Sequence, residues 1–320
     1  MGRKDVIWLG EAEKSIDIAG KTYIVTGANS GVGLETTRQL IKQGGHVVLA
    51  CRRIEAANEA AKSFDGLKGS HNVMKLDLAD LQSVRTFSEE FQKKYDRLDG
   101  LVCNAGLVSM DGGIKRTSGG LELTMGVNYF GHFLLTELLL DLLKKSAPSK
   151  LIILSSVVHA GSPDKRPKVH LEDLHYHTRP YKAFEAYAEA KVAAILYALE
   201  LAERLQGTGV TTASVHPGWA RSNFGQGGGL LTRMIMGIMR PLVASMTNSN
   251  EESAQTTLYC LLSDKVSSHS GAYFSQQSVL YRDKECRGGG WPMTSPNPHA
   301  RDIEEARKLV AASREVVGLQ

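Results

Sequence analysis

Two hydrophobic patterns alternate along the chain. Short runs of apolar and β-branched residues predict buried strands, and longer segments with apolar residues at every third or fourth position predict helices. We expect strands at residues 22–26, 46–50, 72–76, 98–103, 151–154 and 210–215. We expect helices at residues 33–43, 54–64, 81–95, 121–145 and 184–205, followed by a late edge strand at 272–275 and a closing helix at 300–317.

The alternation of strands and helices through short loops predicts the fold class. Such an order is typical of α/β proteins with a parallel sheet and helices on both faces, the doubly wound or Rossmann arrangement. No linker rich in proline or serine divides the chain, so we expect one domain over residues 21–320 after an N-terminal extension at 1–20. Within this domain we expect a substrate lid near residues 219–247.

The composition narrows the class of protein. Of the 320 residues, 42% are hydrophobic and 22% are charged, which is typical of a soluble globular chain and excludes a disordered or collagen-like one. The net charge is only +4 and no run of lysine or arginine forms a stripe, so a nucleic-acid partner is not expected. Four cysteines without CxxC pairs or metal-ligand spacing indicate a reducing compartment, and we expect a cytoplasmic protein.

Membrane contact is expected to be peripheral at most. The most apolar segment, residues 229–246, is interrupted by Arg233, Arg240 and Pro241, whereas a spanning helix needs about 20 apolar residues. The first 20 residues carry charges in place of the apolar centre of a signal peptide. The pattern leaves open whether residues 229–246 contact a membrane, a substrate or another subunit.

A glycine-rich loop follows the first expected strand and opens the first expected helix. Glycines in this position permit a tight turn, and they let backbone N–H groups approach a phosphate at the helix N-terminus. The context favours a dinucleotide site over an ordinary turn. The residues expected to contact the cofactor here are Gly27, Asn29, Ser30, Gly31, Val32 and Gly33.

The end of the second expected strand discriminates between the two nicotinamide cofactors. An acidic residue there would bind the ribose 2′-hydroxyl of NAD, and a basic residue accommodates the 2′-phosphate of NADP. This chain has Arg52 and Arg53 and no acid at that point. The sequence therefore predicts NADP, although two solvated charges at a helix start would look the same.

Tyr187 and Lys191 are four positions apart in the expected helix at residues 184–205, so their side chains share one face. A phenol with a pKa near 10 exchanges protons poorly at neutral pH unless a nearby cation stabilises the phenolate. Lys191 would supply that cation. Ser156 follows a strand and would lie at the carboxyl edge of the sheet, where ligands bind in such folds.

These features occur in a fixed order together with further motifs. The sequence resembles the short-chain dehydrogenase/reductases over roughly residues 21–274, and within that family it is most similar to the retinol dehydrogenases, with a weaker likeness to light-dependent protochlorophyllide reductases. The motifs that carry the resemblance are TGANSGVG, CNAG, GVNYFGHF, SS after a strand, YAEAK and HPG.

The resemblance implies a role for each matching residue. Tyr187 would be the general acid or base, Lys191 would lower its pKa and hold the nicotinamide ribose, and Ser156 would bind the substrate oxygen. Asn128 would hold Lys191 through a water molecule and complete a proton relay. The remaining residues implied to line the cofactor are Asp77, Leu78, Asn104, Ala105, Gly106, Pro217 and Gly218.

The sequence also departs from its family. Membrane-bound retinol dehydrogenases begin with a hydrophobic anchor, which the first residues here do not resemble, so retinoid as substrate stays open. Residues 157–186 form a long insertion that we expect to shape specificity. Protochlorophyllide reductases carry a cysteine where this chain has Ala193, which speaks against the photochemical reaction.

We therefore expect an NADP-dependent enzyme that passes hydride between nicotinamide and a small lipophilic aldehyde, ketone or alcohol, with relatives that often form homodimers. Two alternatives remain: reduction of a conjugated C=C bond, and an NADP(H)-binding interaction protein with weak activity. His170, His175 and His177 have no third ligand at a known metal spacing, so we expect solvated loop histidines and no metal.

Overall fold

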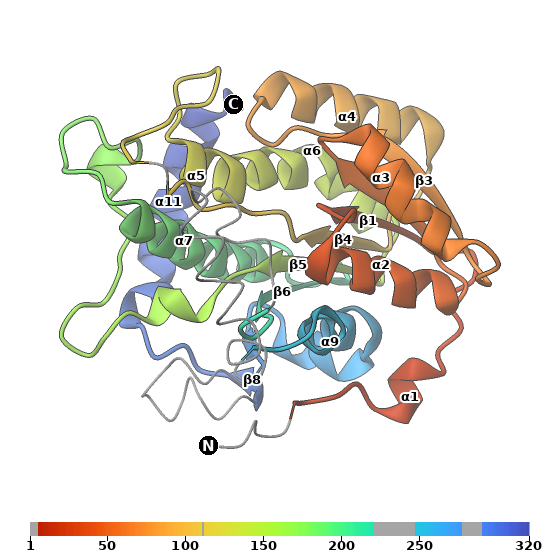
Figure 1. Cartoon of the computed structure of the whole chain (residues 1–320). Coiled ribbons are helices and arrows are strands. Elements are labelled where there is room, and N and C mark those ends of the chain that lie inside the picture. Colours follow the sequence, from red (N-terminus) through yellow and green to blue (C-terminus); the bar gives the residue numbers. More distant parts are fainter. Residues whose placement is uncertain (1–5, 111, 221–246, 277–289, 320) are drawn as a thin grey trace, which may run out of the picture.

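The computed structural model describes residues 6–110, 112–220, 247–276 and 290–319. In these parts the chain forms one eight-stranded sheet with the strand order β3-β2-β1-β4-β5-β6-β7-β8 (Figure 1). Every neighbouring pair is parallel except β7 and β8. The strands are β1 (Thr22–Thr26), β2 (His46–Cys51), β3 (Ser70–Lys75), β4 (Gly100–Cys103), β5 (Ser149–Leu154), β6 (Val210–His216), β7 (Tyr273–Ser275) and β8 (Gly290–Met293).

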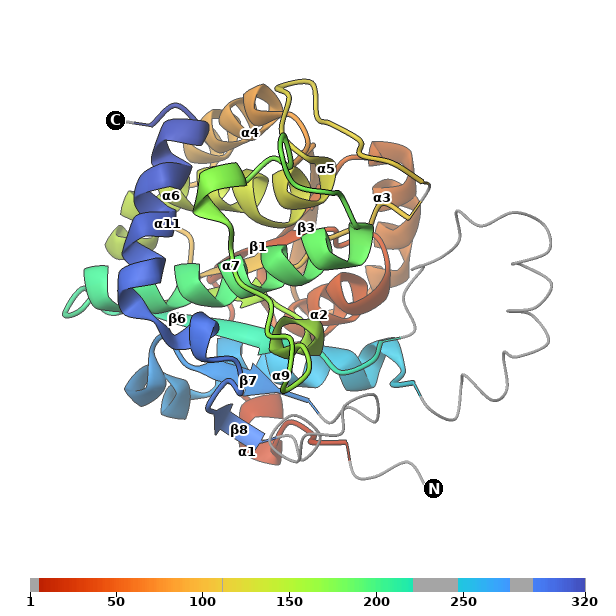
Figure 2. The ribbon, with the colours of Figure 1, turned by 90° about the vertical axis from the view of Figure 1, so that its left-hand side faces the viewer.

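Helices cover both faces of the sheet, as expected from the alternating pattern (Figures 1 and 2). One face carries α2 (Gly31–Lys42), α3 (Ile54–Ala61) and α9 (Asn250–Leu262), which share one apolar core with it. The other face carries α4 (Leu81–Lys94), α5 (Leu123–Met125), α6 (Gly131–Lys145), α7 (Ala183–Arg204) and α11 (Ile303–Val316), around a second core. The short α1 (Glu11–Lys14) precedes β1. The Rossmann prediction is confirmed.

Two details at the sheet edge and in one helix differ from the sequence prediction. β7 lies where we expected an edge strand, but the antiparallel β8 covers it. The pattern missed β8 because its four residues, GWPM, include a proline, which is rare inside strands. The tract expected as one helix over residues 121–145 is α5, a π-helical turn at Gly126–Phe130, and α6. Every residue of the turn is buried, including the polar Asn128, so no exposed position marks the break.

The C-terminal helix α11 packs across α7 and is joined to it through a buried carboxylate (Figure 2). Glu137 on α6 accepts hydrogen bonds from Tyr197 and Arg204 on α7 and from Arg314 on α11. Burial raises the pKa of Glu137, but these donors outweigh it and hold the pKa below its usual value. Three helices thus meet at one ionised group.

The expected lid lies mostly outside the described residues, since residues 221–246 are not described. The residues on either side of this segment lie next to each other, because the backbone N–H of Asn248 donates to the carbonyl of Trp219 at 2.8 Å. Over the described residues, no helix is long and apolar enough to cross a membrane.

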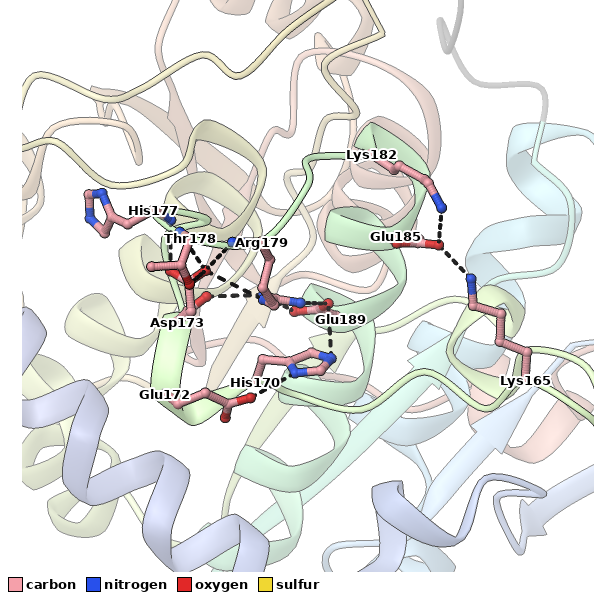
Figure 3. Close-up of polar contacts among 10 residues, drawn as sticks. All are labelled: Lys165, His170, Glu172, Asp173, His177, Thr178, Arg179, Lys182, Glu185 and Glu189. Carbon is pink, nitrogen blue, oxygen red and sulfur yellow. Dashed lines mark hydrogen bonds and ion pairs between the residues drawn. The ribbon is translucent and has the colours of Figure 1, made fainter.

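The long insertion before α7 is folded around Asp173 (Figure 3). Its carboxylate accepts the backbone N–H groups of His177, Thr178 and Arg179 at 2.7–3.0 Å, and the Thr178 hydroxyl at 3.0 Å. Burial alone would raise the pKa of Asp173, but these hydrogen bonds outweigh it and lower the pKa well below its usual value. The turn is therefore held by an ionised carboxylate.

Arg179 fastens this turn to the helix that carries Tyr187. Its guanidinium donates to both carboxylate oxygens of Glu189 on α7, at 2.8 and 3.1 Å (Figure 3). The ring of Tyr176, whose φ of +55° is left-handed, lies 4.1 Å from the guanidinium carbon. His170 approaches Glu189 from the other side at 4.0 Å. We call residues 170–179 together with Glu189 the insertion clamp.

The insertion clamp predicts a large stability cost for removing one partner. Arg179→Met leaves the Glu189 carboxylate, only 7% exposed, without its bidentate partner, and we expect the free energy of unfolding to fall by about 3 kcal/mol. The double variant Arg179→Met/Glu189→Met should recover much of that loss, because no charge stays buried. Urea denaturation measures both.

Lys182 provides the matched control. Lys182 pairs with Glu185, which lies one helical turn before Glu189 on α7, and both side chains are exposed to solvent. Lys182→Met should therefore lower the free energy of unfolding by less than about 1 kcal/mol. Equal losses for Arg179→Met and Lys182→Met would show that the buried pair has no special role in holding the insertion.

Candidate active site

The residues expected to bind the cofactor and substrate gather at the carboxyl ends of the parallel strands. The glycine-rich loop follows β1, Arg52 and Arg53 follow β2, and Asn104 to Gly106 follow β4. Ser156 follows β5 and Pro217 follows β6. In doubly wound sheets this edge is where ligands bind, so the topology alone places these segments around a common site.

The glycine-rich loop fits a dinucleotide phosphate. α2 begins at Gly31, whose φ of +61° is left-handed and favours glycine. A Cβ at Gly33 would lie 2.5 Å from the side-chain nitrogen of Asn104 and 2.7 Å from the carbonyl oxygen of Gly27. Only a glycine therefore lets the loop close against β4, and this leaves the N-terminus of α2 free of side-chain bulk, as an anion site requires.

The second strand ends in a buried thiol followed by two exposed arginines. The sulfur of Cys51 accepts backbone hydrogen bonds from Ala28 and Asn29, although its burial still raises its pKa. This contact joins the glycine-rich loop to the strand that leads to Arg52 and Arg53. No motif in the sequence indicates this contact, because a cysteine inside a strand looks like any packing residue.

Tyr187, Ser156 and Lys191 come together as predicted. The Ser156 hydroxyl is hydrogen-bonded to the Tyr187 phenol, and the Lys191 ammonium lies 5.5 Å from the centre of the Tyr187 ring. The same ammonium donates to the carbonyl oxygen of Leu154 at 2.8 Å. Ser155 turns away and donates to the backbone carbonyl of Lys191 at 2.8 Å. The contacts thus assign Ser156, and not Ser155, to the side of Tyr187.

The charges of Tyr187 and Lys191 are set mainly by burial. Burial of the phenol raises the pKa of Tyr187 to about 12, and the hydrogen bond to Ser156 only partly offsets it. Burial lowers the pKa of Lys191 to about 8. Desolvation is the main influence on the Tyr187 phenol, and the lowering of its pKa that we expected from Lys191 stays a prediction. Tyr187 therefore holds its proton at neutral pH.

Asn128 lies beside this group, on the π-helical turn before α6. Its side chain is held by Leu107, whose N–H donates to Oδ1 and whose carbonyl accepts from Nδ2, each at 2.8 Å. A Cβ built on Gly106 would lie 3.1 Å from Asn128 Oδ1 and 3.8 Å from Lys191 Nζ. The loop after β4, Asn128 and Lys191 therefore meet within contact distance.

The remaining residues that were predicted to line the cofactor lie outside the group around Tyr187. Asp77 accepts the backbone N–H of Ala79 at 3.0 Å, and Leu78 is buried against α6, where its carbonyl would lie 2.4 Å from a Cβ on Gly131. Both follow β3, on the adenine side of the expected site. Pro217 and Gly218 follow β6 and begin the segment whose continuation is not described.

Two histidines, His159 and His216, are buried in this region, and His216 belongs to the HPG motif. His159 contacts the carbonyl oxygen of Ser156 through Nδ1 at 2.6 Å and the Ser295 hydroxyl through Nε2 at 2.8 Å. Burial lowers the pKa of His159 to about 4 and that of His216 to about 3. Within the described part of the chain, His170, His175 and His177 belong to no cluster that could hold a metal ion.

Comparisons with known proteins identify the family. A sequence profile described as short chain dehydrogenase matches residues 21–164. The human protein named retinol dehydrogenase 13 is 38% identical, and the match covers 99% of this chain and 90% of that protein. The mouse protein named retinol dehydrogenase 11 is 40% identical over 85% of this chain and 83% of its own length. The likeness to protochlorophyllide reductases stays a prediction.

Solved structures share the fold. An uncharacterised protein from Mycobacterium paratuberculosis superposes with a TM-score of 0.75 at 28% identity, covering 98% of this chain and 99% of its own. The complex of RhlG with NADP from Pseudomonas aeruginosa has a TM-score of 0.63 at 22% identity, over 82% of this chain and 96% of its own. By its site, its fold and these relatives, the chain belongs to the short-chain dehydrogenase/reductase family of oxidoreductases and is related to the retinol dehydrogenases.

Proposed function

We propose that the protein reduces a lipophilic aldehyde or ketone with NADPH, with Tyr187 as the general acid. The observation that carries the proposal is the contact of a protonated Tyr187 with Ser156, one helical turn from the Lys191 ammonium. A developing alkoxide needs a hydrogen-bond donor and a proton at the same point, and these two hydroxyls offer both.

Each residue of the chain has one task in this proposal. Ser156 binds and orients the carbonyl oxygen. Tyr187 gives its proton to that oxygen as charge develops on it, and the ammonium of Lys191 stabilises the resulting phenolate. Asn128 takes part in the proton relay that reprotonates Tyr187. When bound, the cofactor would supply the hydride that reaches the carbonyl carbon, so the substrate gains two electrons and two hydrogens and the cofactor is oxidised.

The proposal for NADP rests on Arg52 and Arg53. Both side chains are exposed at the end of β2, where a guanidinium is free to bind a 2′-phosphate with two parallel hydrogen bonds. The substrate class rests on the relatives, whose printed names are retinol dehydrogenases. Retinal is therefore one member of the carbonyl panel to be tested. A cytoplasmic location with abundant NADPH would favour reduction over alcohol oxidation.

Tyr187→Phe tests the general acid. The variant keeps the ring but loses the transferable proton, so we expect kcat for carbonyl reduction to fall by about 10²- to 10⁴-fold. Absorbance at 340 nm measures the rate, and NADPH fluorescence measures the cofactor Kd, which should stay unchanged. Full activity in Tyr187→Phe would remove Tyr187 from the mechanism.

Arg52→Ala/Arg53→Ala tests the cofactor. Loss of the charge-assisted hydrogen bonds should raise KM for NADPH by on the order of tenfold or more, while KM for NADH should change little because NADH lacks the phosphate. Parallel titrations with both cofactors give the ratio. If the wild type prefers NADH, or if both KM values rise equally in the variant, the two arginines do not bind the 2′-phosphate.

The lowered pKa of Lys191 predicts an alkaline limit to activity. With a pKa of about 8, Lys191 loses its positive charge above pH 8, so kcat/KM should fall by about tenfold per pH unit there. The folded-state pKa lies below the usual value of 10.5, so this group makes the fold more stable as pH rises from 8 to 10.5. Unfolding linked to Lys191 therefore cannot imitate the loss of activity.

The control for the pH profile is Lys191→Arg. Arginine stays protonated across this range, so the alkaline limb should move upward or vanish even if the variant is slower. A wild-type profile that stays flat to pH 10, or an alkaline limb unchanged in Lys191→Arg, would show that another group sets the limit.

A further inference from the structure

His132 is a buried histidine that the mechanism above does not use. It lies on α6, one helical turn after Asn128, and its side chain reaches two elements of the site. Its Nε2 lies 2.9 Å from the hydroxyl oxygen of Thr26, and its Nδ1 lies 3.3 Å from the backbone carbonyl of Asn128. Both ring nitrogens of an imidazole with 3% exposure are thus engaged.

The partners fix the protonation of the ring. A carbonyl oxygen only accepts, so Nδ1 carries the proton and donates to Asn128, and Nε2 accepts from the Thr26 hydroxyl. Burial lowers the pKa of His132 to about 3, so the imidazole is neutral throughout the physiological range. His132 therefore supplies one donor and one acceptor and no charge.

Thr26 extends this connection to the cofactor loop. Its hydroxyl oxygen accepts the backbone N–H groups of Asn104 and Ala105, each at 2.9 Å. The side chain of Asn104 donates in turn to the Thr26 carbonyl at 2.7 Å. The single hydroxyl proton of Thr26 has two acceptors within reach, His132 Nε2 at 2.9 Å and the Val102 carbonyl at 3.3 Å. The shorter contact is the one to the imidazole, which therefore helps to orient the hydroxyl.

The other end of the connection reaches the proton relay. Asn128 belongs to the π-helical turn at Gly126–Phe130, a backbone form that is rare in helices and common at functional sites. Leu107 holds the Asn128 side chain, and His132 holds its carbonyl. His132 thus joins the turn that presents Asn128 to the end of β1 and, through Thr26, to the loop after β4.

We propose that His132 is a positioning residue that fixes the cofactor loop at residues 104–106 and the relay residue Asn128 relative to each other. The proposal rests on the function proposed above. The contact of His132 with Thr26 acts on cofactor binding. The contact of His132 with Asn128 acts on the proton transfer in which Lys191 and Tyr187 take part. A residue that merely filled space at this position would need neither ring nitrogen.

Two substitutions separate the two contacts. Asparagine places its amide near the position of Nδ1, so His132→Asn keeps a donor for the Asn128 carbonyl and loses the acceptor for the Thr26 hydroxyl. Glutamine reaches the position of Nε2, so His132→Gln keeps an acceptor for Thr26 and loses the donor to Asn128. His132→Leu removes both hydrogen bonds while it retains apolar bulk.

The readouts are the NADPH Kd by fluorescence, and kcat at saturating NADPH by absorbance at 340 nm. His132→Asn should raise the Kd by on the order of tenfold, the effect of one buried hydrogen bond, with kcat within about threefold of wild type. His132→Gln should keep the Kd and lower kcat by on the order of tenfold. His132→Leu should show both losses.

Tyr129→Phe controls for a general loss of stability. Tyr129 is the neighbour of Asn128, is equally buried, and donates to or accepts from Ser313 on α11 at 2.9 Å, away from the cofactor. Its variant should lower Tm about as much as His132→Leu while Kd and kcat stay unchanged. If Tyr129→Phe changes Kd and kcat as His132→Leu does, or if all His132 variants keep both values within twofold, the positioning role is wrong.

The wild-type protein separates failure of this proposal from failure of the proposed function. If wild type binds NADPH but reduces no carbonyl in the panel, the proposed function fails, and the Kd values of His132→Asn and His132→Gln still decide the Thr26 contact. Equal Kd values in those two variants would then overturn the positioning role. A wild-type protein that binds neither NADPH nor NADH overturns both.

Discussion

The buried ammonium of Lys191 is the constraint on which the rest of the site depends. Its hydrogen bond to the carbonyl of Leu154 ties α7 to the end of β5, and the hydroxyl of Ser155 returns the connection by donating to the Lys191 carbonyl. A charge in this position is costly, so the surrounding groups are arranged around it. The loop at Gly106 lies close to the Asn128 side chain, where a Cβ would be 3.1 Å from Oδ1, and within van der Waals reach of the ammonium, which the same Cβ would meet at 3.8 Å.

The same strategy recurs around the site: buried polar groups connect elements that are distant in the sequence. Thr26 joins β1 to the loop after β4, Cys51 joins β2 to the glycine-rich loop, and Glu137 joins three helices. The insertion clamp does the same on the outer side of α7, with Arg179 between the insertion and Glu189. Apolar packing forms the two layers of the fold, while these polar contacts determine how the layers are positioned at the carboxyl edge.

The sequence predicted the layers and the succession of strands and helices along the chain, because both follow from hydrophobic periodicity. It also placed Tyr187, Ser156 and Lys191 together, since a four-residue helical spacing and the end of a strand are local features. It missed β8, whose partner β7 is separated from it in the chain, and it missed the π-helical turn, where every residue is buried. His132 and Cys51 escaped notice because their roles depend on contacts across 106 and about 20 residues of chain, which periodicity cannot show.

The packing of α11 has a consequence for the order in which the protein can fold during synthesis. The helix comprises residues 303–316, which are synthesised after α6 and α7, yet its Arg314 donates to the buried Glu137 carboxylate on α6. α6 and α7 thus emerge from the ribosome well before the helix that packs against them. Until α11 has been synthesised, the buried Glu137 carboxylate lacks one of its three donors and α7 lacks a packing partner, so these helices complete their packing late in synthesis.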